Sequence, residues 1–359
     1  MSEEKSFKFD VVIGNPPYQE ETHGKETKNG QKRVKSIFHL FQEQVEEVAE
    51  DTTALIYPGG RWIHRSGKGM QKFGLKQIND PHLEKLVFYP NSNEVFANVG
   101  IADGVSIVYK DMHKTKPGFQ YEYVKKGKAT QLMLENPGEQ LMPLDPEDTT
   151  RMQKVNEFVK KNNLAYLHNQ VLSQKLFGIE SSFVEENPDR VYPYSAKFDS
   201  EKFIKLFAND KAGKAGRATW FLADKDVVKK GTKYVNEWQV VVSSANAGGQ
   251  KRDNQLAIMD NHTAFGRSRV ALRSFKTARE AENFKSYVSS FVIRYTFLMS
   301  DEALTSLAKW VPDLGDYSDE NNFLNFNESI DDQLCSLIGF SEEDFSYIKS
   351  KVIHFREDK

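Results

Sequence analysis

The sequence holds almost no cysteine: Cys335 is the single one among 359 residues. One cysteine excludes a disulfide framework and a cysteine-rich zinc site. The eight histidines are scattered without a ligand-spaced pair, so no metal site is expected. No apolar run approaches the roughly 18 residues of a membrane span, and the first residues lack the apolar stretch of a secretory signal. We therefore expect a soluble, cytoplasmic protein with no membrane contact.

Charged residues of both signs are present but unevenly distributed. Residues 301–359 hold 14 acidic and 5 basic side chains, a net charge of −9, whereas the whole chain carries only −2. The first 300 residues therefore carry +7. A basic body with an acidic end is typical of a protein that binds a polyanion through its basic part.

The first 110 residues alternate between strand-like and helix-like patterns. They predict a strand at 9–14, a helix at 34–49, a strand at 53–57, a helix at 68–79, and strands at 86–89 and 105–109. The apolar run that ends at Gly14 predicts a buried strand. This alternation favours an α/β fold with a largely parallel sheet. The polar, proline-dotted residues 111–150 predict a linker or an irregular entry into a second domain.

The rest of the chain gives weaker patterns. A short helix is predicted at 151–161, followed by mixed strand-like segments such as 238–242. Thr277 and Glu280 form a capping box that opens a long helix reaching Leu298. Serine N-caps predict two terminal helices, at 329–338 and 341–353. We therefore divide the chain into residues 1–125, 126–275 and 276–359.

One motif carries chemistry: the strand at 9–14 is followed directly by Asn15-Pro16-Pro17-Tyr18. This tetrapeptide resembles the catalytic motif of the amino-group DNA methyltransferases, and its asparagine resembles the N6-adenine enzymes of restriction–modification systems, of the type II and type III-like groups. Residues 57–62, 93–101 and 104–107 resemble further blocks of their catalytic domain. Residues 280–287, 330–334 and 339–343 resemble their C-terminal segments.

The chemistry of the reaction explains these residue types. The amine of adenine is a poor nucleophile because its lone pair is delocalised into the ring. Two acceptors against its N–H bonds, the side-chain oxygen of Asn15 and a proline carbonyl, would aim that lone pair at a methyl donor. Pro16 suits this role because its φ is fixed and it has no competing N–H. Tyr18 offers a flat face to a base turned out of the duplex.

The resemblance implies S-adenosylmethionine as cofactor, bound at a glycine-rich turn after an earlier strand. Only 14 residues precede Asn15, and neither Ser66-Gly67-Lys68-Gly69 nor Ala247-Gly248-Gly249 follows a strand in the required way. The chain therefore looks like the C-terminal half of such an enzyme. We expect the cofactor site to come from an N-terminal segment or from another subunit.

Double-stranded DNA is the expected partner. Basic residues follow Tyr18 in a glycine-containing loop, and a second basic group lies between residues 211 and 273. The fold class expected is thus α/β: a partial Rossmann-like methyltransferase sheet in the catalytic half (1–125), a mixed α+β target-recognition domain (126–275) and a C-terminal helical region (276–359). Phosphate contacts would position the DNA. The candidate DNA-binding residues are Lys28, Lys32, Arg33, Lys35, Arg217, Arg252, Arg267 and Arg269.

Two alternative functions remain open at this point. Without its own cofactor site, the chain could be a non-catalytic DNA-binding specificity module. It could also be a protein-glutamine N5 methyltransferase, because an amide nitrogen poses the same chemical problem as the amine of adenine. The large region after Lys110 argues against the second alternative, since those compact enzymes do not need it.

Overall fold

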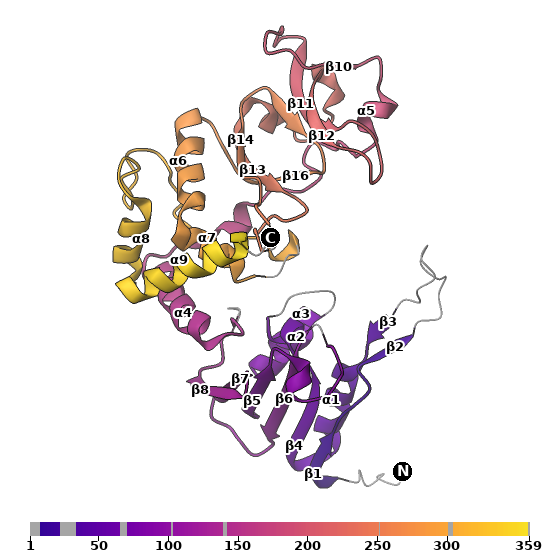
Figure 1. The fold of residues 1–359 in the computed structure, drawn as a ribbon, viewed down its shortest axis with the longest axis vertical. Coiled ribbons are helices and arrows are strands. Elements are labelled where there is room, and N and C mark those ends of the chain that lie inside the picture. Colours follow the sequence, from indigo (N-terminus) through magenta and orange to yellow (C-terminus); the bar gives the residue numbers. More distant parts are fainter. Residues whose placement is uncertain are drawn as a thin grey trace, which may run out of the picture. The chain divides into compact units, whose positions relative to one another are not determined.

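The computed structural model describes residues 8–21, 34–64, 70–101, 103–138, 142–250, 252–300 and 304–357. The chain divides into two compact units, Met1–Thr150 and Arg151–Lys359 (Figure 1). Among the residues described, no helix is long and apolar enough to cross a membrane.

The first unit contains a six-stranded sheet with the order β1-β4-β6-β5-β7-β8. The strands are β1 (Phe9–Gly14), β4 (Ala49–Pro58), β5 (Leu83–Tyr89), β6 (Val105–Asp111), β7 (Phe119–Lys125) and β8 (Lys128–Leu134). The α/β class is as expected, but the expectation of a largely parallel sheet is wrong. Only β1/β4 and β5/β7 pair in parallel, while β6 runs antiparallel to both of its neighbours. The reason is that residues 90–104 join β5 to β6 without the crossover helix that a parallel pair requires.

Residues 111–150 are not a linker. They contribute β7 and β8, which pair in register from Phe119↔Leu134 to Lys125↔Lys128. Alternating burial along β7, with Phe119, Tyr121 and Tyr123 inward, shows that its polar residues occupy the outer face. The boundary expected after residue 125 falls in the turn between these strands, and the compact unit continues to Thr150.

β1 is an edge strand, which corrects the expectation that it is buried. It pairs with β4 on one side, and no other described strand pairs with it. Its apolar side chains are open to solvent: Phe9 is 50% exposed, Val11 58% and Ile13 75%. An apolar sequence indicates that a strand favours a buried position. Whether the strand is buried depends also on neighbouring elements, and β1 has a described neighbouring strand on one side only.

Three helices pack against this sheet: α1 (Phe38–Val48), α2 (Gly60–Ile63) and α3 (Met70–Ile78). Their apolar residues join one core with the inward side chains of the strands. At its centre the ring of Tyr57 stacks on Phe38, with 4.9 Å between centroids, and the Tyr57 hydroxyl donates a 3.0 Å hydrogen bond to Gln42. A short hairpin of β2 (Gln19–Glu21) and β3 (Val34–Ser36) precedes α1.

The second unit begins with α4 (Pro146–Lys161), which crosses the division, and continues with strands in separate small sheets. One sheet has the order β10-β12-β11-β15. Its strands are β10 (Val191–Pro193), β11 (Phe203–Asn209), β12 (Ala218–Asp224) and β15 (Thr263–Phe265). A second sheet has the order β14-β13-β16. Its strands are β13 (Trp238–Ser243), β14 (Ala257–Met259) and β16 (Arg269–Phe275). β9 (Ala165–Tyr166) and β17 (Pro312–Asp313) form a two-stranded pair, and a short helix, α5 (Phe183–Glu186), precedes β10.

Four helices follow: α6 (Ala278–Ser289), α7 (Phe291–Leu298), α8 (Ile330–Ile338) and α9 (Glu342–Glu357). The capping box of Thr277 and Glu280 is present as predicted. The single long helix is not, because Ser290 is extended (ψ 152°) and its hydroxyl caps a new helix at Ile293 N–H. Asp331 at the start of α8 accepts from the N–H groups of Phe291 and Val292. A serine can begin a helix as an N-cap or lie inside one. Ser290 acts as an N-cap, and the apolar stripe is therefore divided between two helices.

Candidate functional site around Asn15

The carboxyl ends of β1, β4 and β5 lie at the same edge of the first sheet, because these three strands run in one direction. That edge therefore brings together Asn15–Tyr18 after β1, Pro58–Arg61 after β4 and the loop after Tyr89. The amino end of β6, with Gly104, reaches the same edge from the opposite direction. In open α/β sheets this edge is the usual place for a ligand site.

Asn15 and Pro17 are exposed, whereas Pro16 and Tyr18 are half-buried. The exposure of Asn15 follows from its position: it continues β1, which has no described neighbour on its outer side. No described residue forms a hydrogen bond with the Asn15 side chain, so its amide is available to a ligand. The side chain of Asn15 therefore offers its amide oxygen as an acceptor and its NH2 group as a donor on an exposed surface.

Tyr18 is anchored more firmly than the residues before it. Its ring packs against the core of the first unit, and its carbonyl oxygen accepts a 3.1 Å hydrogen bond from the N–H of Ile37, just before α1. The hydroxyl is buried and has no hydrogen-bond partner among the described residues. Burial accordingly raises the pKa of this phenol above 10.0. The tetrapeptide thus has one fixed end and one exposed end.

The loops beside the tetrapeptide are tightly packed. A Cβ on Gly59 would lie 2.8 Å from Cβ of Ser106, and one on Gly60 would lie 2.7 Å from the carbonyl oxygen of Asp103. The N–H of Gly60 donates to that same carbonyl at 2.7 Å. Gly104 has φ +64°, which a residue with a side chain rarely adopts. These contacts hold the turn after β4 against the start of β6.

Asp103 is a carboxylate at this edge that the sequence analysis did not single out. Burial raises its pKa above 3.8, and Arg61, whose Nε lies 3.6 Å from Oδ1, opposes that rise only in part. The sequence signal was the Asp-Gly pair directly before a predicted strand. An acidic group with a raised pKa beside a candidate site is a functional candidate in its own right.

Of the basic residues expected after Tyr18, Lys35 lies on β3, exposed and opposite Glu20 of β2. The hairpin therefore places Lys35 close in register to the end of the tetrapeptide. Lys28, Lys32 and Arg33 lie outside the described residues.

The four arginines of the second unit have different environments. Arg217 is exposed at the end of the β11–β12 loop, and its guanidinium bonds only to the carbonyls of Lys214 and Gly216. Arg267 is paired with Glu180 at 2.9 Å. Arg269 is half-buried, donates to the carbonyl of Gln255 at 2.9 Å and lies 5.0 Å from the centre of the Phe207 ring. Arg217 and Arg269 therefore keep more of their charge available than Arg267.

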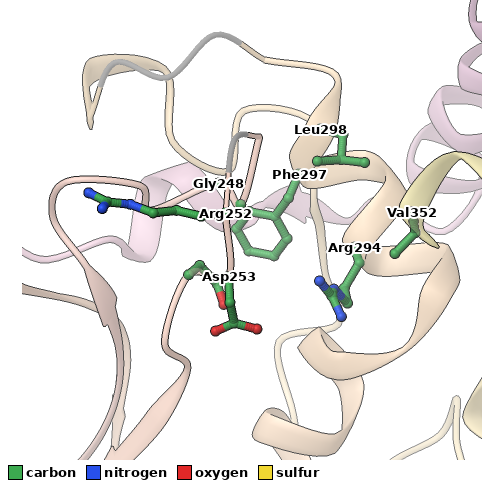
Figure 2. Close-up of a pocket in the computed structure, with 9 residues that line it drawn as sticks. Gly248, Arg252, Asp253, Arg294, Phe297, Leu298 and Val352 are labelled. Carbon is green, nitrogen blue, oxygen red and sulfur yellow. The ribbon is translucent and has the colours of Figure 1, made fainter. Parts of the chain in front are cut away.

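Arg252 is exposed and belongs to the loop after β13, next to a cavity lined also by Gly248, Arg294 and Phe297 (Figure 2). In Figure 2 its side chain extends away from Phe297 and Arg294. The cavity has a volume of about 10 Å³, room for roughly one water molecule. The turn at 66–69 lies outside the described residues.

Phe119 and Phe96 of the first unit differ in whether their rings are open to a ligand. Phe119 is 1% exposed within the core, at the amino end of β7, and so belongs to the packing. Phe96 is half-buried in the loop after β5, at the same edge as Asn15. In the part of the chain that the structure describes, no three His, Cys, Asp or Glu side chains gather as a metal site would require.

Comparison with known proteins finds a likeness in the first part of the chain. Residues 2–96 match the Eco57I restriction-modification methylase family. An "uncharacterized adenine-specific methylase" of Mycoplasma pneumoniae (strain ATCC 29342 / M129 / Subtype 1) is 25% identical over 126 residues, 35% of this chain. The match spans 29% of that relative's length.

Solved structures give a weaker likeness. The type IIL restriction-modification enzyme MmeI superposes with a TM-score of 0.37 and 8% identity, over 96% of this chain and 57% of that one. The type IIG restriction endonuclease BpuSI superposes with a TM-score of 0.34 and 12% identity, over 99% of this chain and 54% of that one. TM-scores below 0.5 establish neither fold nor function. The sequence matches do bear out the resemblance: residues 2–96, which include Asn15–Tyr18, are similar to a family of restriction-modification methylases, and 126 residues of the chain are similar to an adenine-specific methylase.

Proposed function

We propose that this chain is the catalytic and target-recognition portion of a DNA adenine-N6 methyltransferase of a restriction–modification system. The observation that carries the proposal is the exposed Asn15 at the carboxyl end of β1, within the segment that matches the methylase family. The position fits a catalytic group, because the loops after β4 and β5 meet it at the same sheet edge.

In this proposal Asn15 and Pro16 bind the amine of a flipped adenine. The side-chain oxygen of Asn15 accepts one N–H and the carbonyl of Pro16 accepts the other, which directs the nitrogen lone pair outward. Tyr18 contacts the base with the open part of its ring. Since its hydroxyl is buried without a partner, its contribution is the ring and not the O–H group. S-adenosylmethionine would supply the methyl group.

The described residues around Asn15 form an open surface and do not by themselves enclose a methyl donor. Three exposed apolar side chains on β1 support the proposal that further strands pair with its free edge. We propose that these strands carry the cofactor site and belong to an N-terminal segment or to another subunit.

Double-stranded DNA is the proposed substrate. Lys35, next to the tetrapeptide, is the described member of the first basic group, and Lys28, Lys32 and Arg33 are proposed with it. Arg217, Arg252 and Arg269 are proposed as contacts from residues 126–275. Arg267 is proposed as well, although its ion pair with Glu180 must open first. Residues 276–359 would support this domain.

The test is methyl transfer from radiolabelled S-adenosylmethionine to duplex DNA, with the cofactor-binding half supplied. Asn15→Ala should lower the rate about 10²–10³-fold, as loss of a preorganised polar contact does, with little change in DNA affinity. Asn15→Asp keeps the acceptor and should retain measurable transfer. Methylation of adenine at the unmodified rate by Asn15→Ala would refute the proposal. Duplex binding without any transfer would favour a specificity module, and methylation of a glutamine peptide would favour the protein-directed alternative.

A further inference from the structure

One face of the four-stranded sheet in the second unit carries aromatic side chains that pack against the core and remain only partly buried. Along β11, Ile204, Leu206 and Ala208 are buried, while the intervening residues are only partly covered. Residues that pair across neighbouring strands share a face, so Phe207 lies with Trp220 of β12 on the side away from Leu206. The strands β10, β11 and β12 lie together in Figure 1.

These aromatic residues form a continuous row across the sheet. The ring of Tyr194, just after β10, lies 6.0 Å from Trp220, and Trp220 lies 5.1 Å from Phe207. The guanidinium of Arg269 lies 5.0 Å from the Phe207 ring at the end of the row. Tyr194 is 46% exposed, and Trp220 and Phe207 are half-buried. We call Tyr194, Trp220, Phe207 and Arg269 the aromatic row.

A basic loop borders the aromatic row. The pair Phe207↔Trp220 lies two residue pairs from the loop that joins β11 to β12, since Asn209↔Ala218 closes the ladder. Three exposed cations project from this loop: Lys211, Lys214 and Arg217. Its one acid, Asp210, is used within the loop, accepting from the N–H of Arg217 at 2.7 Å. Among the described residues, none of the three cations forms an ion pair with a carboxylate.

Arg269 adds a cation with few partners of its own. It has one hydrogen bond to a backbone carbonyl, and its Nε is buried without an acceptor in the described part of the chain. No described carboxylate lies within ion-pair distance of it. The rings of the row are inclined to one another, by 47° between Tyr194 and Trp220 and by 62° between Trp220 and Phe207. The planar guanidinium of Arg269 over the Phe207 ring therefore adds a separate face on which a base can stack.

We propose that the aromatic row is a binding site for unpaired DNA bases, which stack on it while the basic loop holds the phosphates. Flat rings beside cations are the combination that binds single strands without sequence preference, because each base has a π-face. A proline-rich or saccharide ligand would use the rings but has no need of the cations. This site goes beyond the proposed methylation and needs no cofactor.

The experiment measures fluorescence anisotropy of a labelled deoxythymidine oligonucleotide bound by the full chain, without methyl donor. Trp220→Leu and Phe207→Leu should each weaken binding about tenfold or more. Trp220→Tyr, which keeps a flat ring, should retain most of the affinity. Tyr109→Leu is the matched control, an exposed aromatic residue of the first unit (36%) that should bind as the unmodified chain does.

Two further probes separate stacking from charge. An abasic oligonucleotide of the same length keeps the phosphates but should bind much more weakly. Duplex DNA, whose base faces are covered, should bind Trp220→Leu as tightly as the unmodified chain. Equal affinity for the abasic and base-containing strands, or unchanged single-strand binding by both leucine variants, would overturn the inference. Asn15→Ala should bind the oligonucleotide normally, so failure of methylation and failure of this site are distinguishable.

Discussion

The ammonium group of Lys110 lies 2.5 Å from Oε1 of Glu46, and the lysine side chain is completely buried. The same nitrogen lies 2.5 Å from Oδ2 of Asp80, and the amide of Gln77 donates to the shared Glu46 oxygen at 3.1 Å. β6, α1 and the residues after α3 therefore meet at one buried charge. A buried charge is tolerated only while its partners remain in place.

Removal of this cation should be costly. Lys110→Met leaves two largely buried carboxylates without their counter-ion, and we expect a loss of about 3–5 kcal/mol in the free energy of unfolding. Lys85→Met is the matched control: Lys85 pairs with Glu122 at 2.7 Å on the neighbouring strand but remains 31% exposed, so its loss should cost about 1 kcal/mol or less. Urea unfolding followed by circular dichroism measures both. Similar losses for the two variants would contradict the role given to burial.

The same cluster predicts acid sensitivity. Burial by itself would raise the pKa of Asp80, but Lys110 and the hydrogen bonds from His82 hold it below 3.8. A depressed carboxyl pKa contributes stability that is present above pH 3.8 and is lost as pH falls through the folded-state pKa. The destabilisation caused by Lys110→Met should therefore be large at neutral pH and smaller at about pH 3. An unfolding penalty that does not change between these pH values would refute the assignment.

Two tyrosines with buried hydroxyls should respond in opposite ways to loss of the oxygen. Tyr57→Phe leaves the Gln42 acceptor unpaired in the core and should cost about 1–3 kcal/mol. Tyr18→Phe removes a hydroxyl that has no described partner, so stability should stay the same or increase. Thermal unfolding of the two variants, side by side, provides the comparison. A Tyr18→Phe protein that is the less stable of the two would show that the hydroxyl does have a partner.

The edge strand β1 predicts self-association of the isolated chain. Ile13→Lys changes a side chain that is 75% exposed, so stability should change by no more than about 0.5 kcal/mol, while concentration-dependent light scattering should fall because the apolar edge now carries a charge. Met133→Lys on β8, the opposite edge strand and 77% exposed, is the control. It should alter scattering little, since β8 has mostly polar exposed residues. Equal effects of the two substitutions would place the contact elsewhere.

The strands and helices of the first unit could be predicted from local patterns, whereas their environment could not. The apolar run at 9–14 does form a strand, but its exposure depends on the absence of a neighbour beyond β1. The strand at 119–125 alternates aromatic and polar residues as a strand with one buried face does, but the prolines and polar residues around it favoured the interpretation as a linker. Likewise, the new helix that begins at Phe291 after the break is held by Asp331, which lies 40 residues after Phe291.

The candidate site shows the same division. The sequence pointed to Asn15–Tyr18 as a candidate motif and to Lys35 as a candidate cation, and the pairing of β2 with β3 sets Lys35 opposite Glu20, two residues after Tyr18. The aromatic row could not be predicted, because Tyr194, Phe207 and Trp220 become neighbours only when three strands pair. Asp103 was overlooked since its burial depends on the loops around it and not on its own sequence neighbours.

The ion pairs between α4 and α9 have a consequence for biosynthesis. Arg151 lies 3.1 Å and Lys154 2.6 Å from the carboxylate of Asp344. Lys154 and Asp344 are 190 positions apart in the sequence. All six described strands of the first sheet have been synthesised once β8 has left the ribosome, whereas α4 must wait for Asp344 before it finds its counter-ion. During synthesis the first unit can therefore fold while the cations of α4 still lack Asp344 as their counter-ion. Chaperone binding to the nascent chain is expected to be strongest at that stage.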